Sequence, residues 1–185
     1  MSQDRFAVVL IGHGAPATDC PPQLVGELMS LEWRQPTLHH PAAGEPTSGR
    51  GDGHRLEARA AELDATIRNW PRHAGNDPCK LGLERVAEAL RPLLPTDLLA
   101  IGYNEFCRPS IAEAIDHVIR QGARRVLVIP SMLTPGGVHA ECDIPRALED
   151  ARRAHPGVAI EYLWPFDLHQ VAALLAAHIA RAIRL

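Results

Sequence analysis

The sequence is poor in aromatic residues and carries no large excess of charge of either sign. Aromatic side chains make up 4% of the 185 residues and hydrophobic residues 46%, so we expect a core of aliphatic side chains and alanine. A net charge of −3 gives no electrostatic reason to expect nucleic acid or an anionic membrane as a partner. The length suits one domain over residues 1–185 with a sizeable core.

Long apolar runs and paired cysteines are also missing. No apolar stretch approaches the roughly 18 residues that a membrane helix needs, and the first residues lack the charge pattern of a signal peptide. We therefore expect a cytoplasmic protein without a membrane span. The four cysteines are scattered, with no Cys-x-x-Cys spacing, which favours reduced thiols. The sequence shows no nucleophile elbow, phosphate-binding loop or dinucleotide fingerprint, so acyl transfer and nucleotide chemistry lack support.

Continuous apolar runs predict strands that are buried on both faces, which is typical of a parallel sheet. The predicted strands span residues 6–12, 97–103, 124–131 and 158–164. Helical spacing of apolar residues predicts helices over 54–69, 80–91, 110–121, 144–154 and 168–183. Because strands and helices alternate from residue 97 onward, we predict an α/β three-layer sandwich around a mostly parallel sheet of about four strands.

Local signals mark the ends of two of these helices. Ser110 and Glu113 have the spacing of a capping box, in which each side chain satisfies a free backbone amide. Asp143 and Pro145 suit the start of the helix over 144–154. In the last helix we expect an inward apolar face made by Val171, Leu174, Leu175, Ile179 and Ala182, with His178 packed on the same face.

Residues 15–53 break this pattern and are predicted to be an irregular insertion. Proline and glycine are frequent in residues 36–53, which show no periodicity. Before them, Leu24, Leu28, Leu31 and Trp33 have the spacing of a short amphipathic helix. A long insertion after a first strand is typical of lids and binding segments.

Two histidines follow predicted strands. His13 comes directly after the first strand, and His139 follows the third strand and a glycine turn at residues 136–137. Parallel strands end at one rim of the sheet, where open α/β folds bind ligands, so we expect both imidazoles to face one crevice. Glu105, at the end of the second strand, reaches the same rim if these strands are neighbours. Two imidazoles and a carboxylate suit a divalent transition metal with open coordination positions.

Each of these residues also has a simpler interpretation. His13 alone fits an inert histidine at a strand end, His139 a solvated loop residue and Glu105 a surface or helix-capping acid. Glu141 and Asp143 are expected to favour the positive N-terminus of the following helix.

Other side chains near this rim are weaker candidates. Cys107 and Cys142 fit buried thiols better than ligands of a soft metal. Arg108 suits either a substrate carboxylate or an exposed helix start. His39, His40 and His54 fall in or beside the insertion and are expected to be solvated.

Taken together, the segments around these residues resemble the CbiX/SirB family. The similar segments are Ile11-Gly12-His13-Gly14, Glu105 with residues 108–114, residues 121–130, and Pro135-Gly136-Gly137-Val138-His139 with Asp143-Ile144-Pro145. Members of this family are class II chelatases that insert cobalt, iron or nickel into sirohydrochlorin-type tetrapyrroles. The resemblance covers residues 6–14 and most of 97–185.

The resemblance implies a chelatase-like lobe in which His13 and His139 are the metal-binding histidines and Glu105 is the acid at the second strand. These three residues would serve both as metal ligands and as catalytic residues. It also implies a tetrapyrrole and a divalent metal (Co²⁺, Fe²⁺ or Ni²⁺) as substrates, no other cofactor, and a role in cobalamin or siroheme synthesis. Because only one lobe is recognisable, it implies a homodimer.

The chain departs from the family in two places, and other functions stay open. Ala15 follows His13-Gly14, where the family often has serine or threonine, and the insertion at 15–53 is longer than in short members. Residues 14–18 are faintly similar to protoheme ferrochelatases, so the tetrapyrrole stays open. The alternatives are a metal-binding protein without catalysis, such as a chaperone or sensor, and a tetrapyrrole-binding or metal-removing protein on the same fold.

Overall fold

A four-stranded parallel sheet forms the centre of the molecule. The computed structural model describes residues 5–33 and 50–183. The strands are β1 (Phe6–Gly12), β2 (Leu99–Tyr103), β3 (Arg125–Pro130) and β4 (Ala159–Tyr162). They lie in the order β2-β1-β3-β4, and all neighbours are parallel. Each strand falls within its predicted range, and the predicted parallel sheet is confirmed.

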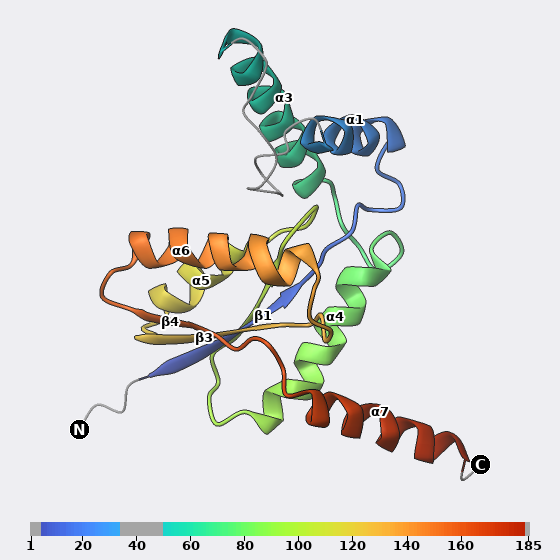
Figure 1. Ribbon diagram of the computed structural model, residues 1–185, viewed down its shortest axis with the longest axis vertical. Helices are drawn as coiled ribbons and strands as arrows, with labels where there is room; N and C mark the ends of the chain where they lie inside the picture. The colour runs from blue at the N-terminus through green and yellow to red at the C-terminus, as the bar shows by residue number, and fades with distance from the viewer. Residues whose placement is uncertain (1–4, 34–49, 184–185) are drawn as a thin grey trace.

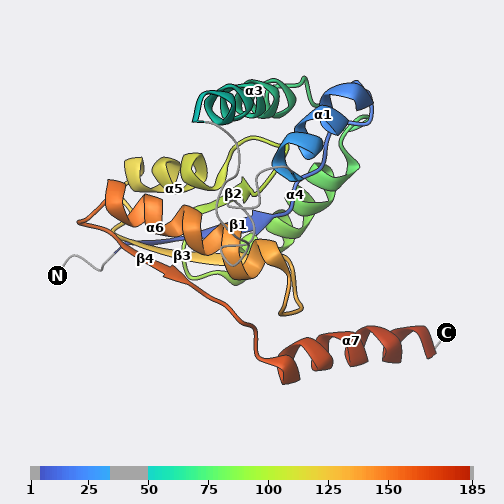
Figure 2. The same ribbon diagram turned by 45° about the horizontal axis from the view of Figure 1, so that its top comes forward.

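Helices cover the sheet on both faces (Figures 1 and 2). On one face, α5 (Ile111–Arg120) and α6 (Ile144–Ala154) pack against Val9 and Ile11 of β1 and the inward residues of β3. On the other face, α4 (Pro78–Leu90) packs its Ala87 against Val8 and Leu10. The short helix η1 (Arg91–Leu93) follows α4. Successive residues of β1 therefore face opposite layers, which confirms the three-layer sandwich.

Two further helices, α1 (Pro22–Trp33) and α3 (Arg50–Arg68), lie beyond the carboxyl end of β1 (Figure 1). Leu28 and Leu31 of α1 share a core with Leu63 and Ile67 of α3. The predicted insertion thus contains the short helix that its leucine spacing indicates, and α3 starts before the predicted residue 54. Residues 34–49, with His39 and His40, lie outside the described residues.

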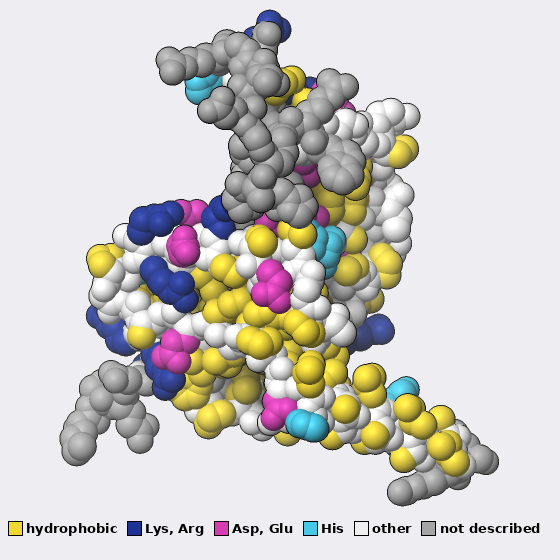
Figure 3. Space-filling model, viewed as in Figure 1, with side chains coloured by type: hydrophobic (Ala, Val, Ile, Leu, Met, Phe, Trp, Pro, Cys, Tyr) yellow, Lys and Arg dark blue, Asp and Glu magenta, His cyan; other side chains and the backbone are white. Residues whose placement is uncertain are grey.

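The last helix, α7 (Leu168–Ile183), does not have the predicted inward face. None of its residues is buried, and Leu175 and Ile179 are 55% and 58% exposed. The helix runs away from the sheet, and hydrophobic side chains lie along its surface (Figures 1 and 3). His178 is exposed as well, so its prediction as a packed histidine is wrong. Periodicity correctly predicts an apolar face, but it does not say whether the same chain covers that face.

The start of α5 confirms the predicted capping box. The Ser110 hydroxyl accepts from the Glu113 amide at 3.2 Å, and the Glu113 carboxylate accepts from the Ser110 amide at 2.7 Å. The cap fixes where α5 begins, directly after the loop that leaves β2. In the described part of the chain, no helix combines the length and apolar character needed to cross a bilayer.

Candidate functional site

Backbone pairing between β1 and β2 continues past the ends of both strands and brings two candidate residues together. The amide of Asn104 donates to the Gly12 carbonyl at 2.9 Å, and the amide of Glu105 donates to the His13 carbonyl at 2.9 Å. His13 and Glu105 are therefore neighbours across the rim of the sheet, as strand adjacency predicts.

Gly14 makes this close approach of the two loops feasible. Its φ is +89°, a conformation that side chains other than glycine rarely adopt. A Cβ atom at this position would lie 1.9 Å from the Glu105 carbonyl oxygen. Any larger residue would push the His13 loop away from the Glu105 loop.

His139 reaches the same rim from the other side of β1. β3 pairs with β1, and the loop after β3 leads into one turn of π-helix, η2 (His139–Asp143), directly before α6. The ring centroids of His13 and His139 lie 4.5 Å apart, with the ring planes nearly perpendicular at 85°. The structure thus brings together two imidazoles that are 126 positions apart in the sequence.

His13, Glu105 and His139 form one cluster of metal-ligating groups. Each offers one ligand atom, and these atoms all lie within 4.8 Å of one another. The Glu105 carboxylate is near both rings, with Oε2 4.0 Å from His13 Nε2 and Oε1 3.6 Å from His139 Nδ1. Ligand atoms about 2.1 Å from one tetrahedral ion are about 3.4 Å apart, so the cluster has to contract to bind one ion. The His13 side chain is 46% exposed, which leaves the cluster open to a substrate.

Hydrogen bonds orient both imidazoles. His13 Nδ1 lies 2.6 Å from the Gly14 carbonyl oxygen, and His139 Nδ1 lies 2.7 Å from Oδ2 of Asp143. A carbonyl and an ionised carboxylate only accept, so each Nδ1 carries the hydrogen and each Nε2 keeps a lone pair. The side-chain nitrogen of Asn104 lies 2.9 Å from the same His139 Nδ1, so Asn104 also borders this ring.

Two further residues contact His139: Asn104, which the sequence did not single out, and Asp143, which it offered only as a weaker candidate. Asp143 was expected to serve the start of α6, but its side chain makes no capping hydrogen bond there. Its position four residues after His139, on one turn of helix, is the signal that could have identified it. Glu141, the other acid near His139, instead accepts from the Gly136 amide and lies outside the cluster.

The weaker candidates have structural partners. Cys107 is fully buried, its thiol donates to the Ala15 carbonyl, and burial raises its pKa, so it stays a neutral thiol and not a thiolate ligand. Arg108 is exposed and pairs with Glu113, which accounts for its charge. His54 is exposed beside Glu57 on α3, outside the cluster.

Comparison with known proteins points to one family. The model of the CbiX family matches residues 79–182, more than half of the chain, a stretch that includes Glu105 and His139. The sirohydrochlorin cobaltochelatase of Priestia megaterium is 32% identical over 100 residues, which are 54% of this chain and 32% of that protein. The protein of the same name from Sulfurisphaera tokodaii is 32% identical over 89 residues, 48% of this chain and 70% of that protein.

A solved structure supports the fold. It is a cobalamin biosynthesis CbiX protein from Marinobacter aquaeolei, with a TM-score of 0.52 and 17% identity over 97% of this chain and 99% of that one. The matches with the first two curated relatives span only 32% and 46% of their lengths. The family match, the shared lobe and the histidine cluster at its rim agree: this chain belongs to the CbiX family.

Proposed function

We propose that this chain inserts a divalent metal, cobalt above all, into a sirohydrochlorin-type tetrapyrrole. The observation that carries the proposal is the convergence of His13, Glu105 and His139 at an open rim of the sheet. The relatives from Priestia megaterium and Sulfurisphaera tokodaii support it, because both are named sirohydrochlorin cobaltochelatases. Iron and nickel, and hence siroheme synthesis, belong to the same proposal because imidazole and carboxylate ligands accept these ions too.

The chemistry of insertion fits these side chains. A divalent ion replaces two pyrrole N–H protons, so two protons leave the ring for each ion that enters. Two imidazoles and one carboxylate hold an ion while leaving positions open for pyrrole nitrogens. As the ion passes to the ring, the imidazoles and Glu105 are free to accept the protons, because both groups are bases near neutral pH.

A cavity beside the cluster limits where the ring can lie. It has a volume of about 290 Å³ and is lined by Asn104 and Asp143, which contact His139, and by Arg146 of α6. This volume is at the low end of pockets that enclose a small ligand. We therefore place the macrocycle over the open rim and not inside this cavity.

The test is an insertion assay that follows the visible spectrum of sirohydrochlorin with Co²⁺. We expect the metal-dependent change to be faster with protein than without it, and to fall to the protein-free rate in His13→Ala and His139→Ala. Tight Co²⁺ binding without acceleration, for sirohydrochlorin and protoporphyrin alike, would instead support a metal chaperone or sensor. Parallel assays with Fe²⁺ and Ni²⁺ rank the metals.

We also propose that the chain forms a single domain that works as a homodimer. The support is a pair of apolar faces without a partner in the described chain. The α7 stripe around Leu175 and Ile179 is exposed, and Leu127 and Ile129 of β3 are only partly covered on the face where α4 packs over β1 and β2. In a two-fold dimer, each copy can pack its α7 stripe against the partly covered β3 face of the other copy, so both apolar faces are buried twice. The four free cysteines fit a reducing compartment, and we propose the cytoplasm.

A further inference from the structure

The loop that carries Glu105 is held in an unfavourable conformation. It spans residues 104–109 between β2 and α5, and Phe106 has a φ of +56°, which is rare for a residue other than glycine. The amide of Cys107 donates to the carbonyl of Glu105 at 2.6 Å, so the chain turns sharply around Phe106. Such a conformation persists only where the surrounding structure fixes it.

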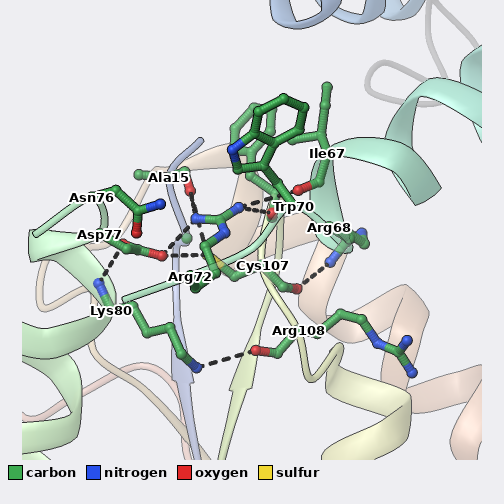
Figure 4. Close-up of polar contacts among 12 residues, drawn as sticks. Ala15, Ile67, Arg68, Trp70, Arg72, Asn76, Asp77, Lys80, Cys107 and Arg108 are labelled. Carbon is green, nitrogen blue, oxygen red and sulfur yellow. Dashed lines mark hydrogen bonds and ion pairs between the residues drawn. The ribbon is translucent and has the colours of Figure 1, made fainter. Parts of the chain in front are cut away.

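Arg68, the last residue of α3, fixes the loop on both sides of Glu105. Its Nη2 donates to the Asn104 carbonyl at 2.8 Å. Its Nη1 donates to the Cys107 carbonyl at 3.0 Å, the contact drawn in Figure 4. Asp64, one turn earlier, accepts from Arg68 Nε at 2.8 and 2.9 Å and orients the guanidinium. One planar cation thus spans the residues before and after Glu105.

Arg72 joins the same loop to the loop that carries His13. Its Nη2 donates to the Phe106 carbonyl at 2.5 Å, and its Nη1 donates to the Ala15 carbonyl at 2.7 Å. The Arg72 guanidinium is nearly buried and pairs with buried Asp77 at 2.5 Å (Figure 4). Ala15 is two residues from His13, so this cation sets the separation of two candidate ligands.

We infer that Arg68 and Arg72 are positioning residues for the metal site, an inference that rests on the proposed function. Neither guanidinium is a ligand; they act through the backbone carbonyls of residues 15, 104, 106 and 107. Arginine suits this task because its fixed fork of donors reaches two acceptors at once, which a lysine ammonium does not. Residues 64–77, which supply the arginines and their carboxylates, thereby become part of the site although they precede the segment that matches the family model.

The experiment is a double-mutant cycle on Co²⁺ affinity, read from the absorption of bound Co²⁺ in the full chain. The variants are Arg68→Met, Glu105→Ala and the two combined. Arg59→Met is the matched control, because Arg59 also lies on α3 and pairs with Glu27 and Glu62 but does not contact the loop. Far-UV circular dichroism checks the fold of each variant. If Arg68→Met does not fold, Arg68→Lys takes its place in the cycle, because lysine keeps the charge but cannot reach both carbonyls.

We expect Arg68→Met to weaken Co²⁺ binding by about 10- to 100-fold, the range seen when groups that orient a metal ligand are removed. Arg59→Met should leave the affinity unchanged, and Arg68→Met should have no further effect once Glu105 is alanine, because it acts through that residue. Equal affinity in Arg68→Met and wild type, or an equal loss with and without Glu105, overturns the inference alone. Wild-type protein that binds no Co²⁺ overturns the proposed metal site as well.

Discussion

Single residues assemble the cluster chiefly by letting the His13 and Glu105 loops come close together and by holding the imidazole rings in place. Gly14 is the clearest case, because its missing side chain lets the His13 loop touch the Glu105 carbonyl. Asp143 and the Gly14 carbonyl then fix the tautomers of the two imidazoles. The arrangement of the cluster therefore depends on residues outside the candidate ligand set.

Replacing Gly14 should separate the two loops. We expect Gly14→Ala to lower the free energy of unfolding by about 1–3 kcal/mol, because alanine is strained at a φ of +89° and its Cβ meets the Glu105 carbonyl. Co²⁺ affinity should fall with it. Gly137→Ala is the control, since its added Cβ meets no atom within 4 Å. Urea unfolding and Co²⁺ titration measure both quantities, and equal behaviour of the two variants would refute this role.

Removing the Asp143 carboxylate should leave His139 misoriented. We expect Asp143→Ala to weaken Co²⁺ binding by about 10- to 100-fold while the fold survives, because Nδ1 loses its acceptor. Glu141→Ala, two residues earlier in the same turn, should bind Co²⁺ as the wild type does. If the two variants lose affinity equally, Asp143 has no special part in orienting the ring.

Sequence patterns predicted the cluster itself but not what surrounds it. His13, Glu105 and His139 follow from a general rule, because residues that end neighbouring parallel strands meet at one rim. Asn104, Asp143, Arg68 and Arg72 act through contacts that form only once the chain is folded. Arginine at the end of a helix is common on surfaces, so nothing in the sequence separates Arg68 from a solvated residue.

Secondary-structure elements were predictable where local chemistry fixes them. The strands lie in segments rich in apolar residues, and α5 starts at its capping box. The turn at η2 was not predicted, because a π-helical turn differs from the start of an α-helix only in its hydrogen bonds. For α7 the apolar spacing correctly predicts an apolar face. No described part of the chain packs against that face, and periodicity cannot show this.

The cap of α5 makes a separate contribution to stability. We expect Ser110→Ala to lower the free energy of unfolding by about 1 kcal/mol, because the Glu113 amide loses its acceptor at the helix start. Ser30→Ala removes a hydroxyl that donates to the Gly26 carbonyl within α1, and it should lower the free energy of unfolding by less. Urea denaturation of the two variants checks this, and a larger loss at Ser30 would count against the cap.

At the scale of the whole molecule, the three-layer sandwich places the candidate site at the rim of its sheet. The α1–α3 pair and α7 extend beyond the sandwich. The α1–α3 pair lies beyond the carboxyl end of β1 and supplies Arg68, while α7 extends away from the sheet (Figures 1 and 2). The sandwich was predicted because its strands and helices alternate in order. The placement of these helices depends on long-range packing that periodicity does not encode.

The exposed face of α7 should govern the oligomeric state. We expect light scattering to give the mass of a dimer for the wild-type chain and of a monomer for Leu175→Glu combined with Ile179→Glu, because two charges cannot be buried in an apolar interface at low cost. Gln170→Glu adds charge to the same helix off the apolar stripe and should leave the dimer intact. A monomeric wild-type chain would show that α7 is not a contact between copies.

Crystals soaked with Co²⁺ and measured at the cobalt absorption edge test the central claim most directly. One anomalous peak within about 2.0–2.2 Å of a nitrogen of His13, a nitrogen of His139 and an oxygen of Glu105 is the predicted result. A peak bound to only one of these residues, or lying elsewhere on the chain, would contradict a shared metal site at this rim.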